Sequence, residues 1–342
     1  MTIRFGFVGL DHWYNAFPTL ETLTGSREAE VVALAHRDPA RAREVGERFG
    51  VTVAASYDEV IGRDDVDAIC VFTSTDEVAD VTVRGLESGK AVVAIKPMAM
   101  DLPGADLIVE AVRRTGGRYF PNDAARQFFP ANVQFKEWIE AGKIGDLLAA
   151  TCVFRAGLPR DWPDGQTPGW FADPARAPGG AFIDHAVYHV DLLRWLFGSE
   201  VVSVSGSVAN VRHRDLAVED WGHAVLRFAN GKMGVIEDTW TSGPGAPKES
   251  IEIVGSRGSL INDNAVGRML INGEFGLNGW LQTPPPTART SFIQHVIRVL
   301  KGEEQPVSDA ERARTNLAVC LAIYESARSG REVKLAPEGT SA

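Results

Sequence analysis

The chain has 342 residues, enough for two domains of ordinary size, and its composition, 44% hydrophobic and 23% charged, is typical of a globular protein. Acidic side chains outnumber basic ones by 45 to 35, and the resulting net charge of -10 argues against nucleic acid or an anionic membrane as a partner, because both attract basic patches. The three cysteines lie apart in apolar runs without metal-ligand spacing, and the sequence shows neither a signal-peptide core nor an apolar run of transmembrane length. These features predict a cytoplasmic protein with reduced thiols.

The first third of the chain alternates short apolar runs with helical patterns. Strands are predicted at 3–9, 30–35, 68–72 and 91–95, a helix after the first strand, and further helices at 39–49, 77–88 and 102–114. Strands that alternate with helices indicate βαβ crossovers and a parallel sheet, and continuously apolar strands fit a sheet covered on both faces. We therefore predict a doubly wound α/β domain whose ligand lies beyond the carboxyl ends of its strands.

The turn after the first strand reads Gly9-Leu10-Asp11-His12-Trp13, where a dinucleotide-binding sequence would read G-x-G-x-x-G. Gly9 is in place, but Asp11 holds the position of the second glycine and would put a carboxylate near a bound pyrophosphate. All five residues are predicted cofactor contacts. For His12 and Trp13, ordinary loop residues are an equally good interpretation.

The second strand ends in His36-Arg37, without the acid that binds the ribose hydroxyls of NAD in this position. A nearby arginine can instead accept the 2′-phosphate of NADP, so these residues favour NADP slightly, although Arg37 could also be a solvated surface side chain. Thr73, Ser74 and Thr75 follow the third strand at the same edge of the sheet and complete the predicted cofactor contacts in this region.

The fourth strand runs into Ile95-Lys96-Pro97, three further predicted cofactor contacts. The proline restricts the backbone and fixes the direction of the lysine, which stands at the edge where the ligand is expected. A lysine whose pKa is lowered by burial can donate a proton, so Lys96 is also a candidate catalytic and substrate-binding residue. The alternative is a common exposed lysine at the end of a strand.

A second group of polar residues stands on a predicted helix within 179–198. The helix opens with Gly179-Gly180, which suggests close approach by another backbone or by a ligand. Asp184, Tyr188 and Asp191 share one face, and His185 and His189 form a second pair four residues apart beside them. A helix packed in a core does not need so many titratable side chains in its first turns, so we interpret this segment as an active-site helix. The alternative is a surface helix with its polar side in water.

These motifs resemble those of the Gfo/Idh/MocA family of nicotinamide-dependent oxidoreductases. The likeness is carried by Ile95-Lys96-Pro97, by Arg126-Gln127-Phe128-Phe129-Pro130 with one inserted residue, by Ala141-Gly142-Lys143-Ile144-Gly145, by Gly179, Gly180, Asp184 and Asp191, and by later segments at 219–221, 228–231 and 324–330. It implies a dinucleotide-binding Rossmann domain over 1–122, an α+β domain over 123–335 with a large, mostly antiparallel open sheet, and a tail over 336–342. In the family that sheet commonly joins subunits, which implies a homodimer or homotetramer.

The second domain's strands are expected at 148–154, 201–211, 221–228, 232–239 and 250–261, with closing helices at 291–300 and 309–329. Asn230-Gly231 is a hairpin turn sequence and supports antiparallel pairing.

Tyr188 stands where most family members have a histidine, and His189 follows one residue later. Some sugar-oxidising relatives carry tyrosine there, so the resemblance implies that Tyr188 has the proton-transfer role. A phenol has a reference pKa near 10, and Lys96 would be needed nearby to lower it. His189 lies about 100° round the helix and is interpreted as a core or supporting histidine. A metal at His185 and His189 has no evident third ligand, so no metal is predicted.

A loop rich in tryptophan, arginine and proline spans 155–171. Aromatic faces cover the C–H surfaces of sugars and charged groups bind their hydroxyls, so Arg155, Asp161 and Trp162 are predicted substrate contacts, together with Arg126 and His185. The alternative is a loop that caps the sheet with its tryptophans.

The sequence therefore predicts reversible hydride transfer between NAD(P) and a secondary alcohol or carbonyl of a sugar, cyclitol or related polyol. Lys96 and Tyr188 would handle the hydroxyl proton, and Asp184 would orient the substrate and this pair. Two alternatives stay open: glycoside cleavage or elimination assisted by a tightly bound NAD, and a paralogue that binds dinucleotide or sugar without turnover.

Overall fold

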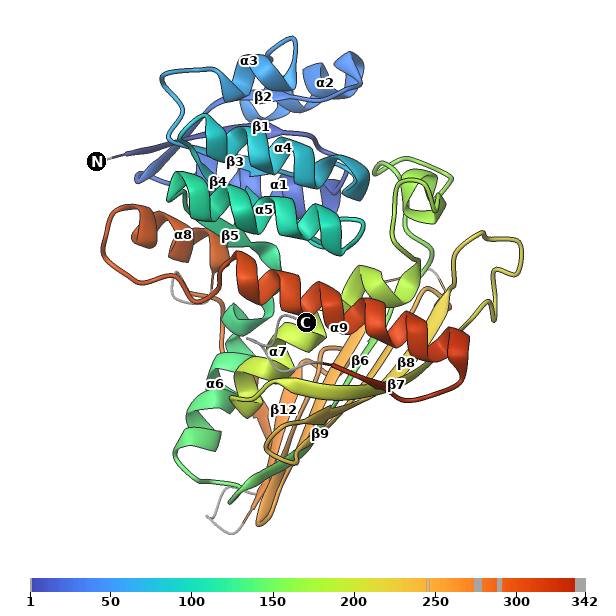
Figure 1. Cartoon of the computed structure of the whole chain (residues 1–342). Helices are drawn as coiled ribbons and strands as arrows, with labels where there is room; N and C mark the ends of the chain where they lie inside the picture. Colours follow the sequence, from blue (N-terminus) through green and yellow to red (C-terminus); the bar gives the residue numbers. More distant parts are fainter. Residues whose placement is uncertain (1, 244, 246, 274–278, 288–290, 336–342) are drawn as a thin grey trace. The chain divides into compact units, whose positions relative to one another are not determined.

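The computed structural model describes residues 2–243, 245, 247–273, 279–287 and 291–335 (Figure 1). Contacts between residues divide the chain into two compact units. The first unit groups Met1–Asp123 with Arg160–Pro178 and Ser291–Leu317, and the second groups Ala124–Pro159 with Gly179–Thr290 and the chain from Ala318 onward. Two later segments thus pack with the first 123 residues, while the domain boundary after residue 122 stays a prediction.

The first unit contains the doubly wound parallel sheet that the sequence predicts. Its strands are β1 (Ile3–Val8), β2 (Ala29–Ala35), β3 (Ala68–Val71), β4 (Ala91–Ala94) and β5 (Tyr119–Pro121), in the order β2-β1-β3-β4-β5. Every neighbouring pair is parallel, and the side chains of β3 and β4 are all buried. Because all five strands run the same way, their carboxyl ends lie along one edge of the sheet.

Helices fill the connections between these strands: α1 (Trp13–Thr24), α2 (Pro39–Phe49), α3 (Tyr57–Ile61), α4 (Thr75–Glu87) and α5 (Leu102–Thr115), with α8 (Phe292–Leu300) added later in the chain. The sequence sets the ends of α2 clearly. The Asp38 carboxylate accepts hydrogen bonds from the backbone N–H groups of Ala40 and Arg41, Pro39 begins the helix, and Gly50 ends it with φ of 67°. α4 contacts both α3 and α5, and α1 contacts α8, as expected for right-handed crossovers on opposite faces of the sheet.

The second unit is built on a nine-stranded sheet in the order β13-β12-β11-β10-β6-β9-β8-β7-β14. The strands are β6 (Leu147–Arg155), β7 (Val201–Ala209), β8 (Trp221–Phe228), β9 (Met233–Thr239), β10 (Lys248–Gly255), β11 (Gly258–Asp263), β12 (Arg268–Gly273), β13 (Gly279–Gln282) and β14 (Val333–Lys334). All neighbouring pairs are antiparallel except β6 with β9, and β8 and β9 are joined by the predicted turn at Asn230-Gly231, where Gly231 has φ of 82°. The expectation of one strand over 250–261 is wrong, because Gly255-Ser256-Arg257-Gly258 turns the chain back and pairs β10 with β11.

Three further helices are α6 (Pro130–Glu140), α7 (Ala181–Phe197) and α9 (Ala310–Ser329), and two short 3-10 helices span Asn122–Phe128 and Gly169–Ala172. α7 packs on β6, β8 and β9. Its two leading glycines are needed for packing, as the sequence suggests. A Cβ on Gly180 would lie 2.0 Å from the carbonyl oxygen of Glu219, and a Cβ on Gly179 would lie 2.2 Å from the hydroxyl of Tyr324.

The N-terminus of α7 has no capping side chain of its own, because Gly180 holds that position. The buried carboxylate of Glu219 takes this role and accepts hydrogen bonds from the backbone N–H groups of Gly180, at 2.9 Å, and Phe182, at 3.1 Å. The Tyr324 hydroxyl donates to the same carboxylate at 2.6 Å. Burial raises the pKa of Glu219, while these hydrogen bonds favour its ionised form.

Replacing Glu219 with alanine should therefore lower the free energy of unfolding by about 2–3 kcal/mol, since it leaves buried donors at the start of α7 without an acceptor. Tyr324→Phe removes one donor and keeps the carboxylate, so it should cost about 1 kcal/mol. Urea unfolding of the two variants beside the wild type measures both effects. Equal stability of Glu219→Ala and the wild type would show that the cap does not hold the helix.

Candidate functional site

The carboxyl edge of the parallel sheet brings the ends of β1 and β3 together. Gly9 follows β1 with φ of 77°, and a Cβ there would lie 2.7 Å from the backbone nitrogen of Thr73. Only glycine fits this position, because any side chain would meet backbone and the torsion favours no L-residue. The structure thus places the predicted cofactor residues Gly9, Thr73, Ser74 and Thr75 at the edge where such sheets bind ligands.

Asp11 points toward the end of the neighbouring strand β2. Its Oδ1 lies 2.6 Å from a guanidinium nitrogen of Arg37, and its Oδ2 lies 3.8 Å from Nδ1 of His36. Arg37 also donates to the Ser74 hydroxyl at 2.8 Å and lies 3.5 Å from the Glu77 carboxylate. Four predicted cofactor residues therefore form one connected cluster, and Glu77 is a member that sequence reasoning missed.

A cavity of about 290 Å³ adjoins this cluster and is lined in part by Asp11, His36, Arg37, Arg41 and Asp161. Asp161 belongs to the segment Arg160–Pro178, which also contributes Gly169, Trp170 and Arg176 to the lining. The Asp161 carboxylate accepts a hydrogen bond from Arg41 at 3.0 Å.

The Trp162 ring stacks on His36, with ring centroids 6.0 Å apart, and lies under the guanidinium of Arg41. Asp161 and Trp162 were predicted to contact substrate. The partners that the structure gives them all belong to the dinucleotide-binding unit, and a substrate contact stays a prediction.

His36 is buried, and burial lowers the pKa of its imidazole. Its Nδ1 has no hydrogen-bond partner among the described residues.

The aromatic residues of the glycine turn after β1 contact other parts of the protein. The Trp13 indole donates to the carbonyl of Arg160 at 2.9 Å, and the His12 ring packs edge-on against Trp170. Leu10 is fully buried, so its side chain is part of the core.

Lys96 follows β4 directly after Ile95, is joined to Pro97 by a cis peptide bond, and is fully buried. The alternative of an exposed lysine at a strand end is therefore excluded. Burial of a charged group is costly unless it has compensating partners.

In the second unit, α7 presents Asp184, His185 and Tyr188 together. The Trp240 indole donates to Asp184 Oδ2 at 3.4 Å, and His185 Nε2 lies 3.5 Å from the same oxygen. The His185 ring stacks on Phe154 of β6, with ring centroids 3.9 Å apart. The helix face predicted from the sequence is thus a polar cluster beside the sheet.

Arg126 belongs to this cluster. Its guanidinium lies 5.0 Å from the centre of the Tyr188 ring and 5.5 Å from that of Phe154, and it forms an ion pair with Glu249 at 2.5 Å. Arg155 does not join it. Successive strand residues face opposite sides of a sheet, so Arg155 and Phe154 lie on opposite faces. On its own face, Arg155 forms an ion pair with Glu237 at 2.7 Å.

His189 is buried, as expected for a supporting residue, and its Nδ1 lies 3.1 Å from the Asp238 carboxylate. Burial raises the pKa of Asp238, and the nearby His189 opposes that shift. The Gln127 amide donates to Asp191 at 2.6 Å. Sequence reasoning missed Trp240, Asp238 and Glu249 because nothing in their local sequence distinguishes them, and only strand pairing brings them to α7.

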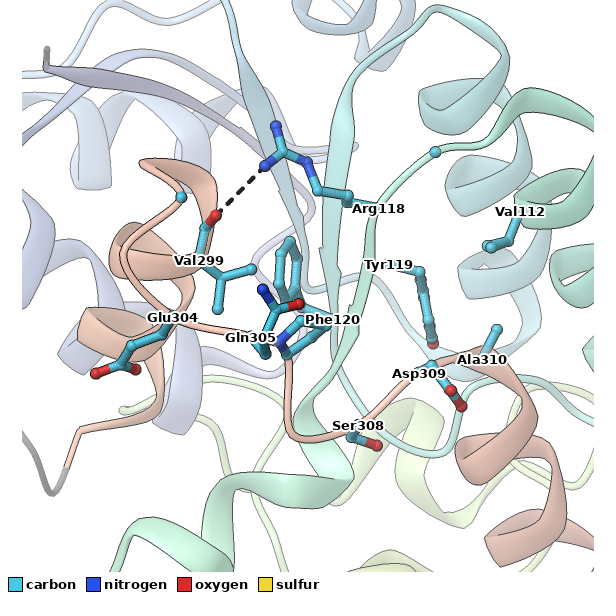
Figure 2. A pocket seen from close by; sticks show the side chains of 13 residues that line it. Val112, Arg118, Tyr119, Phe120, Val299, Glu304, Gln305, Ser308, Asp309 and Ala310 are labelled. Carbon is cyan, nitrogen blue, oxygen red and sulfur yellow. Dashed lines mark hydrogen bonds between the residues drawn. The ribbon is translucent and has the colours of Figure 1, made fainter.

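A second cavity of the first unit, of about 300 Å³, lies beside β5 (Figure 2). Its charged groups are already engaged. Arg118 donates to the carbonyl of Val299 at 3.4 Å, and Glu304 pairs with Arg298 at 2.7 Å. The buried hydroxyls of Tyr119 and Ser308 have no hydrogen-bond partner among the described residues. The cavity thus offers mainly neutral hydroxyls and suits ordered water better than a charged ligand.

Two classes of feature are absent from the part of the chain that the structure describes. No group of three or more histidine, cysteine, aspartate or glutamate side chains is arranged to hold a metal ion. No helix there is both long and apolar enough to cross a membrane.

The parallel sheet with a glycine turn after β1 and polar residues along its carboxyl edge defines the first unit as a dinucleotide-binding fold. Residues 3–123 match the model of an oxidoreductase family with an NAD-binding Rossmann fold, and residues 132–261 match that of the GFO/IDH/MocA C-terminal domain. The chain belongs to the Gfo/Idh/MocA family of oxidoreductases.

Named relatives span nearly the whole chain. The 1,5-anhydro-D-fructose reductase of Ensifer adhaerens is 29% identical over 318 residues, covering 90% of this chain and 91% of the relative. The scyllo-inositol 2-dehydrogenase (NAD(+)) of Bacillus subtilis is 26% identical over 344 residues, covering 97% and 96%. The WlbA dehydrogenase of Bordetella pertussis, solved with NADH and UDP-GlcNAcA, is similar in structure, with a TM-score of 0.80, 25% identity, and coverage of 98% and 99%.

The buried imidazole of His36 yields a pH-dependent stability. Because its pKa is lowered in the folded protein, its contribution to stability is complete above the unfolded pKa, near 6.5, and is lost as pH falls through the folded value. The free energy of unfolding of the wild type should therefore fall more steeply between pH 7 and pH 5 than that of His36→Gln. Urea unfolding across this range measures the difference, and parallel curves would contradict the assignment.

Proposed function

We propose that the protein transfers a hydride reversibly between NAD and a secondary alcohol or carbonyl of a sugar, cyclitol or related polyol. The observation that carries this proposal is the pair of polar centres in an oxidoreductase of this family: a buried Lys96 directly after β4, and the Asp184–Tyr188 face of α7. The substrate class is supported by relatives named for anhydrofructose and inositol and by a similar structure that holds a nucleotide sugar.

Tyr188 and Lys96 would together exchange the proton of the reacting hydroxyl, and Asp184 would accept a hydrogen bond from the substrate. Arg126 lies against the Tyr188 ring, and this cation–π contact would hold the orientation of the ring. His185, stacked on Phe154 and close to Asp184, is positioned to bind a second substrate hydroxyl. The bound nicotinamide supplies only the hydride acceptor or donor.

The residues at the carboxyl edge of the parallel sheet fit a dinucleotide. Gly9 allows backbone to come close, Thr73 Oγ1 and Thr75 Oγ1 are buried without hydrogen-bond partners among the described residues, and α4 begins at Thr75, where backbone N–H groups attract an anion. The slight lean to NADP depended on a free Arg37. Because this arginine is held by Asp11, we propose NAD as the preferred cofactor.

We also propose that the protein is a cytoplasmic homodimer or homotetramer that associates through the open sheet of the second unit. Val153, Val225 and Val235 share the sheet face opposite α7 and are partly exposed, and Val254 on the same face is 40% exposed. The same face carries the Arg155–Glu237 ion pair, and partly exposed valines beside charged groups suit a partner surface.

Lys96→Ala and Tyr188→Phe test the proton-transfer roles. Each should lower kcat for oxidation of the best substrate in a panel of inositols and sugars by at least about 100-fold, the usual scale for losing a general acid or base. Both variants should still bind NADH, because most of the predicted cofactor contacts, among them Gly9 and the cluster around Asp11, are unchanged, and the loss of one contact at Lys96 weakens binding without abolishing it. Steady-state absorbance of NADH measures turnover, and fluorescence titration measures binding.

Tyr119→Phe is the matched control for Tyr188→Phe, since it removes a buried hydroxyl from the second cavity, and it should keep normal turnover. Wild-type kcat in Lys96→Ala would overturn the assignment of this lysine. Glycoside cleavage by dialysed protein without added NAD would instead favour the redox-assisted lyase alternative, and the absence of any dinucleotide binding would favour a sensor.

A further inference from the structure

Besides Tyr14, which holds the position of the third glycine, the first unit departs from the usual dinucleotide-binding pattern in two places. The second glycine of the turn after β1 is Asp11, and the position after β2, where an acid usually binds the adenosine ribose, is His36. Each departure alone predicts weaker binding of NAD. The structure shows that the two positions are neighbours, because Val8 of β1 pairs with Ala35 of β2 and the chain then continues into both loops.

The carboxylate of Asp11 reaches the position that the missing acid would occupy. It lies 3.8 Å from the His36 ring, at the end of β2, and it lines the cavity at that strand end. Arg37 fixes its orientation through Oδ1, while Oδ2 is buried and has no hydrogen-bond partner among the described residues. An oriented carboxylate with one unused oxygen beside a cavity is suited to accept hydrogen bonds from a diol.

We propose that Asp11 replaces the acid after β2: its carboxylate binds the adenosine ribose hydroxyls and thereby makes the protein specific for NAD over NADP. This inference rests on the proposed function, since it presumes that the cavity takes the adenosine end of a dinucleotide. One substitution then explains both departures from the pattern. The sequence alone predicts a carboxylate near the pyrophosphate, whereas in this proposal Asp11, which faces His36 and Arg37, binds the ribose.

The charges around the cavity support the same specificity. Arg37 is paired with Asp11 and Glu77, Arg41 with Asp161 at 3.0 Å, and Arg176 with Asp76 at 3.5 Å. Each arginine that lines the cavity therefore already has a carboxylate partner. A 2′-phosphate would have to displace such a carboxylate and would meet the negative charge of Asp11, whereas a neutral ribose hydroxyl would donate to it.

The test is direct binding of NADH and NADPH to the full chain, measured by fluorescence titration and confirmed by calorimetry. Asp11→Ala and Asp11→Asn should bind NADH about 10- to 100-fold more weakly, the scale of a hydrogen bond to a charged group. Both should bind NADPH more tightly than the wild type, because Arg37 is released and a negative charge is removed. A structural role alone would weaken both dinucleotides and would not reverse their order.

Asp101→Asn is the matched control. Asp101 caps α5 of the same unit outside the cavity, and asparagine removes its charge while keeping a good cap. Its ratio of NADH to NADPH affinity should change by less than about threefold, because this carboxylate does not line the cavity.

Unchanged NADH affinity in Asp11→Asn, or an equal loss for both dinucleotides in both Asp11 variants, would overturn this inference and leave the proposed function intact. Failure of the wild type to bind either dinucleotide would overturn both. Thermal unfolding of each variant without ligand shows whether its fold is intact, and Asp11→Asn, which keeps the size of the side chain, is decisive if Asp11→Ala is unstable.

Discussion

The second unit depends on one buried interaction, the hydrogen bonds from the start of α7 to the carboxylate of Glu219. A helix that is preceded by glycines has no cap of its own, and here Glu219, in the loop just before β8, supplies the acceptor. The same glycines let the backbone of Glu219 come close. The direction of α7 is thereby fixed, and with it the positions of Asp184 and Tyr188. A functional helix held this way tolerates little change at its first turn.

Much of this fold follows from local patterns in the sequence. The apolar strands, the helix limits set by Asp38 and Gly50, and the Asn230-Gly231 hairpin are all short-range signals that the packing confirms. The split of 250–261 into two strands was missed because the prediction followed the alternation at 250–254, although no apolar side chain stands between Val254 and Leu260 and Gly255 and Gly258 mark the turn. Periodicity reports which residues are buried but not where the chain reverses.

The sites were harder to predict than the fold, because their geometry depends on which distant segments meet. The sequence placed Lys96, Asp184 and Tyr188 on particular elements, but it could not show that Asp161 and Trp162 pack against Arg41 and His36. Loop residues take their partners from tertiary packing, and the loop's composition fits a sugar site as well as a cap. The position of Arg155 was in principle predictable, since the alternation of strand residues puts it on the other face of the sheet from Phe154.

In both units, charged side chains near the candidate sites are paired with side chains of opposite charge. Charges that leave water must be paired, so Arg126 is held by Glu249, His189 by Asp238, and Arg37 by Asp11. A paired cation is no longer available to attract an anion, and a paired carboxylate is held in one orientation. The binding chemistry of a cluster therefore depends on which of its oxygens and N–H groups remain unused, and the arginines in the sequence do not by themselves decide which cofactor it binds. In the pair of Asp11 and Arg37, the atom without a hydrogen-bond partner among the described residues is Oδ2 of Asp11, an acceptor that would bind a hydroxyl and repel a phosphate.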